Sequence, residues 1–139
     1  MRNELRVRDI VSDGELIAQV FDFSISGPVI FPTPELAEMQ CGFGEVLAEK
    51  DIRAHVHNIT ERNTKNTSEF IFVLDGRMDI VVLNCVGVAI DQVSILPQTG
   101  FLQYIGGHKI KIAKGTKYFE LKQGPYLGQN ADKTVLVNI

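Results

Sequence analysis

The sequence predicts an all-β protein, folded as a sandwich or barrel in a single domain. Three observations support this prediction. The chain of 139 residues has the usual length of one domain, and 45% of its residues are hydrophobic, enough to bury a core. Short runs rich in Val, Ile, Phe and Tyr recur between Gly, Asn, Asp and Pro. Sustained helical periodicity is hard to find along the chain.

Eleven segments have the composition of strands, and no linker, repeat or low-complexity tract separates them. In chain order they are "LIAQVFDF", "GPVIFP", "GFGEVLA", "IRAHVH", "EFIFVL", "MDIVVLN", "AIDQVSIL", "FLQYI", "HKIKIAKG", "KYFELK" and "TVLVNI". The best helical candidate is "TPELAEM" at residues 33–39, which begins with Thr, Pro and Glu and is about two turns long. We therefore expect one domain over residues 1–139, with at most short helical turns.

Residues 69–83, "EFIFVLDGRMDIVVL", are expected to form a tight antiparallel hairpin. Asp75-Gly76 between two apolar runs is a strong short-range signal for such a turn. The first arm is apolar on both faces, since Phe70 and Phe72 alternate with Ile71. One face can line the core, and the other needs cover from a second sheet, a loop or a partner chain. Homodimerisation through these strands and cover within the chain are both open.

The charge pattern excludes several classes of function. The net charge is −3 and Lys and Arg are scattered, so no basic face is available to neutralise a run of phosphates, and nucleic-acid binding is not expected. No apolar run has the length of a signal segment or of a membrane span. We expect a cytoplasmic protein whose partner is a small molecule.

The stretch "RAHVHN" at residues 53–58 suggests a metal site. On a strand, His55 and His57 would point to the same face. Glu69 opens an otherwise apolar strand, where a carboxylate is costly to bury unless it is paired or coordinated. His108 follows two glycines at a strand junction, where close backbone approach is possible.

Three imidazole nitrogens and one carboxylate oxygen suit Fe, Mn, Ni, Cu or Zn rather than Ca or Mg. Each residue also has a plain alternative. The histidine pair can arise by chance, Glu69 can be a solvated carboxylate at a strand edge, and His108 can be a turn histidine. The order His-x-His, Glu, Gly, His favours the metal site.

This order resembles the first motif of the cupin superfamily. His55, His57, Glu69 and Gly76 match that motif, including the six-residue spacing between Glu69 and Gly76. The departure is "NITERNTKNTS", which places eleven residues between His57 and Glu69 where the general motif has a shorter gap. Its Asn and Thr content is typical of a polar loop.

The second cupin motif begins at Gly and ends at the last metal-binding His. Residues 100–108, "GFLQYIGGH", look like a shortened form of it without its Pro. A rival alignment, "GHKIKIAKGTKY", fits the spacing better but ends at Tyr118. We prefer His108, because the chain also resembles a small group of single-domain cupin-fold metalloproteins.

That group shares His-x-His, a polar loop with Glu-Arg, a Glu on the next strand, "GGH" and "GPY-x-G". All five occur here over about residues 28–130. The resemblance implies a cupin double-stranded β-helix, which is a jelly-roll-like barrel, usually dimeric. It also implies a divalent transition metal, bound here by His55, His57, Glu69 and His108. It assigns no reaction.

Further residues are candidates for binding a substrate beside the metal. They are Arg53, Arg62, Tyr104, Tyr118, Glu120 and Tyr126. A guanidinium can hold a carboxylate or phosphate through two hydrogen bonds. The tyrosines and the glutamate can exchange protons at a barrel mouth, and the "GPYLG" turn can cover it. The two arginines can instead be solvated loop residues, and the tyrosine rings can instead pack against neighbouring side chains.

The sequence thus predicts a metal-binding cupin, and a small metal-dependent enzyme of dioxygenase, isomerase or decarboxylase type. Its substrate would be a small polar metabolite, such as a sugar derivative or an oxo-acid. The alternative is a module that binds or senses a sugar or another small ligand in the same cavity without turnover. Fold alone does not separate these functions.

Overall fold

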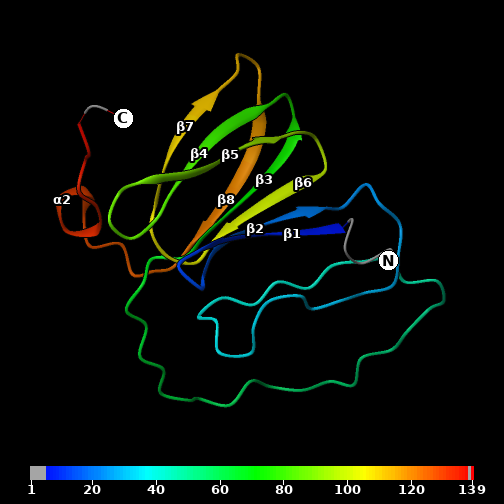
Figure 1. The fold of residues 1–139 in the computed structure, drawn as a ribbon. Helices are drawn as coiled ribbons and strands as arrows, with labels where there is room; N and C mark the ends of the chain where they lie inside the picture. The colour runs from blue at the N-terminus through cyan, green and yellow to red at the C-terminus, as the bar shows by residue number, and fades with distance from the viewer. Residues whose placement is uncertain (1–5, 138) are drawn as a thin grey trace.

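The prediction of an all-β protein is confirmed by the computed structural model, which describes residues 6–137 and 139 (Figure 1). The strands are β1 (Val7–Ser12), β2 (Glu15–Asp22), β3 (Glu69–Asp75), β4 (Met78–Leu83), β5 (Ala89–Ile95), β6 (Thr99–Gln103), β7 (Gly107–Ile112) and β8 (Lys117–Lys122). One short helix, α2 (Gln129–Asp132), follows them. No helix within the described part of the chain is long and apolar enough to cross a membrane.

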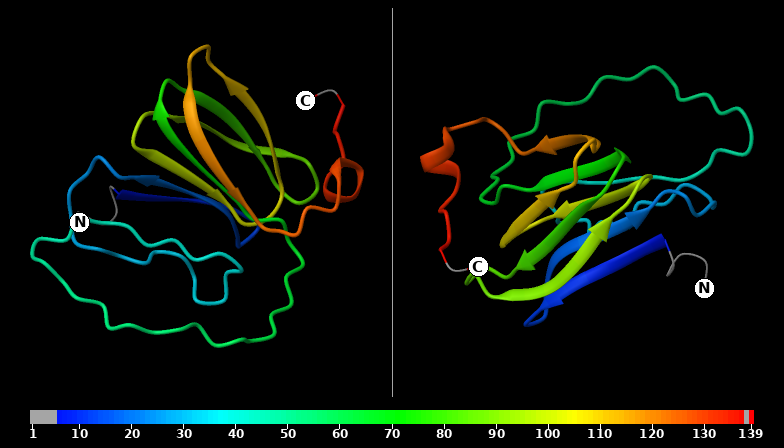
Figure 2. Two further views of the ribbon diagram at one scale, coloured as in Figure 1. Left: turned by 180° about the vertical axis from the view of Figure 1, so that it is seen from behind. Right: turned by 90° about the horizontal axis from the view of Figure 1, so that it is seen from above.

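The strands form two antiparallel sheets that face each other (Figure 2). The larger sheet has the order β1-β2-β6-β3-β8, and the smaller has the order β5-β4-β7. The arrangement is an open sandwich, not a closed barrel, because β7 and β8 are both edge strands.

The predicted hairpin at residues 69–83 is wrong. β3 pairs with β6 and β8, whereas β4 pairs with β5 and β7, so the Asp75-Gly76 turn carries the chain from one sheet to the other. Gly76 has a φ of +91°, a backbone conformation that favours glycine. A Cβ atom added to Gly76 would lie 2.7 Å from the Cα atom of Thr116. Ile71 and Val73 of β3 and Met78, Ile80 and Val82 of β4 form apolar inner faces, so stacking these faces buries more apolar surface than placing the strands side by side.

The core lies between the sheets. Inward residues of β3 and β4 pack in one buried cluster with Val93 and Ile95 of β5 and Phe101 of β6. Ile71, Val73, Ile80 and Val82 are at most 2% exposed. The strict alternation of these residues with outward ones follows from the two-residue repeat of a strand.

The outer face of the larger sheet is covered partly by the chain itself. Phe21 and Leu102 form a second buried cluster with Phe43, which comes from the long connection between β2 and β3. Buried Arg6 places its guanidinium over the Phe43 ring and donates to the Pro28 carbonyl oxygen. The chain itself therefore covers the part of this outer face that β2 and β6 form. Cover by the chain and homodimerisation were the two alternatives that the sequence left open.

The connection between β2 and β3 contains fewer strands than expected. Residues 28–32 and 43–45 make only two isolated bridges, Pro28 with Glu45 and Ile30 with Phe43. Residues 33–39 form turns and not a helix. Residues 46–67, which we call the arm, have no ladder partner and are all exposed. The predicted strand at residues 52–57 is therefore absent from this structure, because no neighbouring strand satisfies its backbone groups.

The ends of the chain also differ from expectation. β1 lies outside the predicted strands because Arg8 and Asp9 interrupt its apolar pattern, yet it pairs along β2. Residues 134–137 and 139 of the predicted last strand have no strand structure, and residue 138 lies outside the described residues. Lys109 Nζ donates to the Ile139 carbonyl oxygen at 2.7 Å, which holds this end beside β7.

Truncation at the centre of the sandwich should be costly. Ile80 is fully buried, so Ile80→Ala should lower the free energy of unfolding by about 2–5 kcal/mol through lost burial and the cavity it leaves. Denaturant unfolding followed by circular dichroism measures this change. Val86→Ala, at an exposed turn residue, is the control and should change it by less than about 0.5 kcal/mol. Equal effects of both variants would contradict the core assignment.

Candidate functional site

A pocket of about 250 Å³ opens between the two edge strands, β7 and β8. Its floor is apolar, with Ile71, Met78, Ile110 and Ile112, and its mouth is polar, with Glu69, His108, Tyr118, Glu120, Lys122 and Lys133. Strand alternation explains the polar row. Glu120 and Lys122 lie opposite Ile71 and Glu69 in the ladder, so all four share the inner face.

Glu69 is the centre of the polar cluster. Its Oε2 atom lies 3.3 Å from His108 Nε2, and its Oε1 atom lies 3.2 Å from Lys122 Nζ. The Glu69 side chain is only 15% exposed. The hydrogen bond to Glu69 raises the pKa of Lys122. Lys122 therefore supplies the positive charge that this largely buried carboxylate requires, while the other oxygen lies beside the His108 ring.

The His108 ring is held by Gln103. The Gln103 Nε2 amide group donates to the carbonyl oxygens of Ile105 at 3.0 Å and Gly107 at 2.7 Å, so its Oε1 atom faces the imidazole. His108 Nδ1–H then donates to that Oε1 atom. In the neutral ring, Nε2 is left with a lone pair that points toward the Glu69 carboxylate.

Burial lowers the pKa of His108, against the opposing effect of the Glu69 and Glu120 carboxylates. The ring is therefore neutral at pH 7, and no proton lies between Nε2 and Glu69. Two hydrogen-bond acceptors face each other at 3.3 Å. Such an arrangement favours a cation between them.

His55 and His57 lie together but apart from this pocket. Their ring centroids are 5.2 Å apart, and both residues are on the exposed arm. His55 Nδ1–H donates to the Arg53 carbonyl oxygen at 2.8 Å, which leaves Nε2 free to bind a ligand. Within residues 6–137 and 139, no three His, Cys, Asp or Glu side chains gather in the manner of a metal site.

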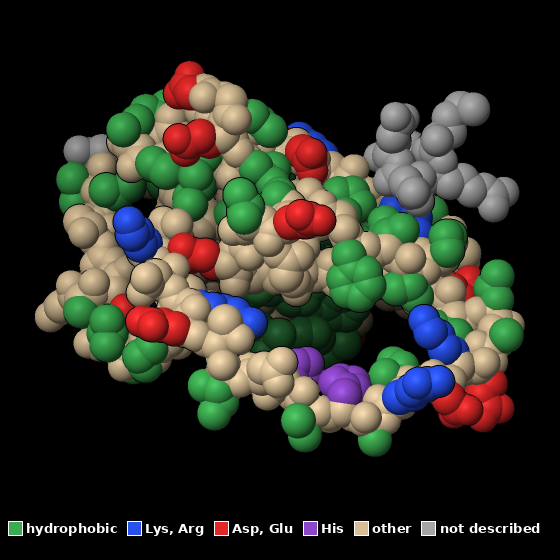
Figure 3. Space-filling model, turned by 90° about the horizontal axis from the view of Figure 1, so that it is seen from below, with side chains coloured by type: hydrophobic (Ala, Val, Ile, Leu, Met, Phe, Trp, Pro, Cys, Tyr) green, Lys and Arg blue, Asp and Glu red, His purple; other side chains and the backbone are tan. Residues whose placement is uncertain are grey.

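Figure 3 shows how the molecule looks from the side of the arm. Histidine side chains lie along a narrow strip of chain that borders a hollow with an apolar floor. Arginine and lysine side chains lie on the same rim. The four predicted ligands thus form two pairs in this structure, one on the arm and one in the pocket.

The predicted substrate residues have different positions. Tyr118 and Glu120 line the pocket beside Glu69, as expected for residues at a mouth. Arg53, Arg62 and Tyr126 are exposed and belong to neither pocket. Arg62 reaches only the carbonyl oxygen of Thr60, at 3.5 Å.

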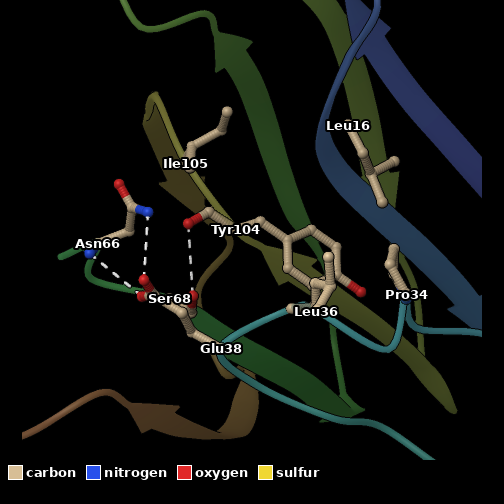
Figure 4. Close-up of a pocket in the computed structure, with 9 residues that line it drawn as sticks. Leu16, Pro34, Leu36, Glu38, Asn66, Ser68, Tyr104 and Ile105 are labelled. Carbon is tan, nitrogen blue, oxygen red and sulfur yellow. Dashed lines mark hydrogen bonds between the residues drawn. The ribbon is translucent and has the colours of Figure 1, made fainter. Parts of the chain in front are cut away.

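Tyr104 is buried in a second pocket, of about 220 Å³, on the outer side of the larger sheet (Figure 4). Its hydroxyl donates to Gln19 Oε1, and burial raises the pKa of that hydroxyl above its usual value. Ser68 donates to the Tyr104 carbonyl oxygen at 3.3 Å. Glu38 accepts from the Asn66 backbone at 3.1 Å and so ties down the base of the arm. Tyr104 therefore serves packing at this place.

Sequence reasoning missed two charged residues that line the pocket, Lys122 and Lys133, and one residue that holds the His108 ring, Gln103. For Lys122 a signal existed, because it continues the alternation of Tyr118 and Glu120 along the strand. For Gln103 and Lys133 the sequence carries no such signal, because their roles depend on contacts between distant segments.

The fold and the pocket define an all-β protein with a site of glutamate, lysine and histidine side chains between two sheet edges. Comparisons with protein families, with curated proteins and with solved structures found no match for this chain.

The stability of the metal-free protein should depend on His108 below neutral pH. In the unfolded chain its pKa is about 6.5, and burial lowers it in the folded chain. As pH falls below about 6.5, the unfolded state therefore binds the proton first, and the free energy of unfolding decreases. The fall continues down to the folded-state pKa.

Chemical denaturation between pH 7.5 and 5 measures this slope. His108→Gln should make the slope shallower, whereas His57→Gln on the exposed arm should leave it unchanged. An unchanged slope in His108→Gln would show that the ring is not buried in its neutral form.

Proposed function

We propose that this protein binds one divalent transition metal through His55, His57, Glu69 and His108, and uses it to act on a small polar metabolite. The observation that carries this proposal is the contact between the His108 Nε2 lone pair and Glu69 Oε2 at 3.3 Å. Two ligand atoms, each about 2.1 Å from one metal ion, lie at about this separation from each other. A hydrogen bond from the opposite ring nitrogen, as Gln103 accepts here, is usual for a metal-binding histidine.

The pairing order of the strands supports a place for the arm. β4 pairs with β5, and β3 pairs with β6, so the pairs are nested around the turn at residues 84–88. If this nesting continued by one more pair, the segment that precedes β3 would pair with β7. β7 has one free edge, and residues 51–58 of the arm precede β3. Nested pairing of this kind is typical of a jelly roll.

The arm has a sequence suited to that edge. Ile52, Ala54 and Val56 alternate with Arg53, His55 and His57, and Val56 is 87% exposed in the absence of a partner strand. Docked antiparallel to β7, the arm would place both imidazoles on the face that carries His108. It would also move the jelly-roll-like barrel toward closure.

The type of reaction would depend on the open coordination positions of the metal in such a site. When bound, the metal supplies a Lewis acid with up to two open positions for oxygen atoms of a ligand. Glu120 and Tyr118 are the groups of the chain that can accept or donate a proton beside that ligand. These groups suit isomerisation, decarboxylation or dioxygenation of a sugar derivative or an oxo-acid.

Metal analysis of protein purified without an affinity tag tests this proposal. Wild type should carry close to one equivalent of transition metal, and His57→Ala and His108→Ala should each lose it. Gln103→Ala should weaken metal affinity by about 10–100-fold, because His108 Nδ1–H would lose the acceptor that orients its ring. Asn58→Ala, beside His57 on the arm, is the control and should keep the metal. Equal metal content in wild type and both histidine variants would contradict the proposal.

Hydrogen exchange tests the docking of the arm. Added metal should protect the amides of residues 51–58, because pairing with β7 supplies their acceptors. Protection of residues 134–137 instead would assign the free edge of β7 to the C-terminal segment and contradict the arm's role. Metabolite turnover by the loaded protein separates an enzyme from a module that only binds.

We also propose that two copies associate through the outer face of β3 and β8. Leu74, Phe119 and Leu121 are 44–58% exposed there, beside the part that the chain covers itself. An apolar strip of this kind is commonly an interface. Leu121→Glu should convert a dimer to a monomer, as measured by light scattering after size exclusion. Val86→Glu is the control at a distant exposed turn, and a monomeric wild type would contradict the proposal.

A further inference from the structure

We propose that the pocket between β7 and β8 selects a small carboxylate anion, an oxo-acid rather than a neutral sugar, and that Lys122 is the residue that binds its carboxylate. This inference rests on the proposed metal site. It goes beyond that proposal because it chooses between two substrate classes. It also assigns a role to two lysines, Lys122 and Lys133, that are not among the residues predicted from the sequence.

The pocket has balanced charges before a metal binds. Its acidic and basic side chains are the carboxylates of Glu69 and Glu120 and the ammonium groups of Lys122 and Lys133. Those four charges sum to zero. A divalent ion held by Glu69 and His108 would raise the sum to +2 in a partly buried site. Unpaired charge is costly there, so the loaded site favours an anionic ligand over a neutral one.

The lysine that faces the metal position is Lys122. Its Nζ atom contacts Glu69 Oε1 at 3.2 Å, and the other oxygen of the same carboxylate faces His108. A metal on Glu69 competes with Lys122 for that carboxylate's charge. The Lys122 ammonium group would then have N–H groups without an acceptor at the pocket mouth. These N–H groups can donate hydrogen bonds to a ligand carboxylate beside the metal.

Lys133 is the second cation at the mouth. It follows α2 (Gln129–Asp132) and lines the pocket with Lys122, although the two lysines come from different segments of the chain. The C-terminal segment thus brings positive charge to the entrance, where it would attract anions.

The shape of the pocket limits the size of the anion. A volume of about 250 Å³ is below the range of about 300–1,000 Å³ of pockets that hold drug-sized ligands. The Ile71, Ile110 and Ile112 floor suits a short carbon chain opposite the charged mouth. A short oxo-acid has both parts, since its carboxylate and its keto oxygen can occupy two metal positions while its alkyl end contacts the isoleucines.

The test uses the protein loaded with Co²⁺, whose visible absorption reports on the ligands of the metal. Pyruvate is the anionic probe, and hydroxyacetone is a neutral probe of matched size and oxygen spacing. Pyruvate should change the spectrum in a saturable manner, and hydroxyacetone should bind at least about tenfold more weakly. Lys122→Met should weaken pyruvate binding by about 10–100-fold, the effect of losing one charge-assisted hydrogen bond.

Lys117→Met is the matched control. Lys117 lies on the same strand but an odd number of residues away, so it faces the opposite side of the sheet. This variant should bind pyruvate as wild type does. Circular dichroism of all variants checks that each is folded.

The outcomes separate this inference from the proposed function. If Co²⁺ gives no protein-bound spectrum, the metal site fails and the inference fails with it. If Co²⁺ binds but pyruvate and hydroxyacetone act alike, or if Lys122→Met and Lys117→Met act alike, the metal site stands and the anion site is overturned.

Discussion

Face-to-face packing of β3 on β4 is the constraint on which the rest of this structure depends. Ile71 and Val73 of β3 belong to one buried cluster with Ile80 and Val82 of β4. Because strand side chains alternate, this packing also brings Glu69 onto the inner face, in line with Ile71. A carboxylate in that position needs partners. The edge strands supply them as Lys122 from β8 and His108 from β7.

The same packing explains why the site is open. The Asp75-Gly76 turn and the turn between β7 and β8 both carry the chain across from one sheet to the other, and Thr116 links them by accepting from the Arg77 amide. β7 and β8 therefore end as edges that face each other across the pocket. Unpaired edges expose backbone groups and invite another strand. The arm is the segment of this chain with the length, the alternation and the histidines to fill that place.

The charged and polar groups of the pocket are held by contacts within the chain. Lys122 and Glu69 neutralise each other, and Gln103 fixes the tautomer of His108 by contacts to two backbone carbonyl groups. The Nε2 lone pair faces Glu69 Oε2 with no donor between them. In the proposed metal site, one cation, the lysine, would be exchanged for another, and the balance of charge would then determine what ligand can follow. Metal and substrate preference would thus be coupled through Glu69.

The sequence by itself determined the all-β class and seven of the eight strands, because these follow from residue alternation and turn residues. It also predicted that the Glu69 and His108 side chains lie close together, because of their chemistry and their order along the chain. It could not determine which strands are neighbours. The Asp75-Gly76 signal describes a tight turn, but only burial of two apolar faces decides that the turn joins two sheets instead of closing a hairpin. Gln103 and Lys133 were likewise beyond the sequence, since their positions arise from contacts between segments far apart in the chain. The arm's composition favours a strand, whereas the fold decides whether an edge is present to pair with it, because a strand is stable only when its backbone groups have partners.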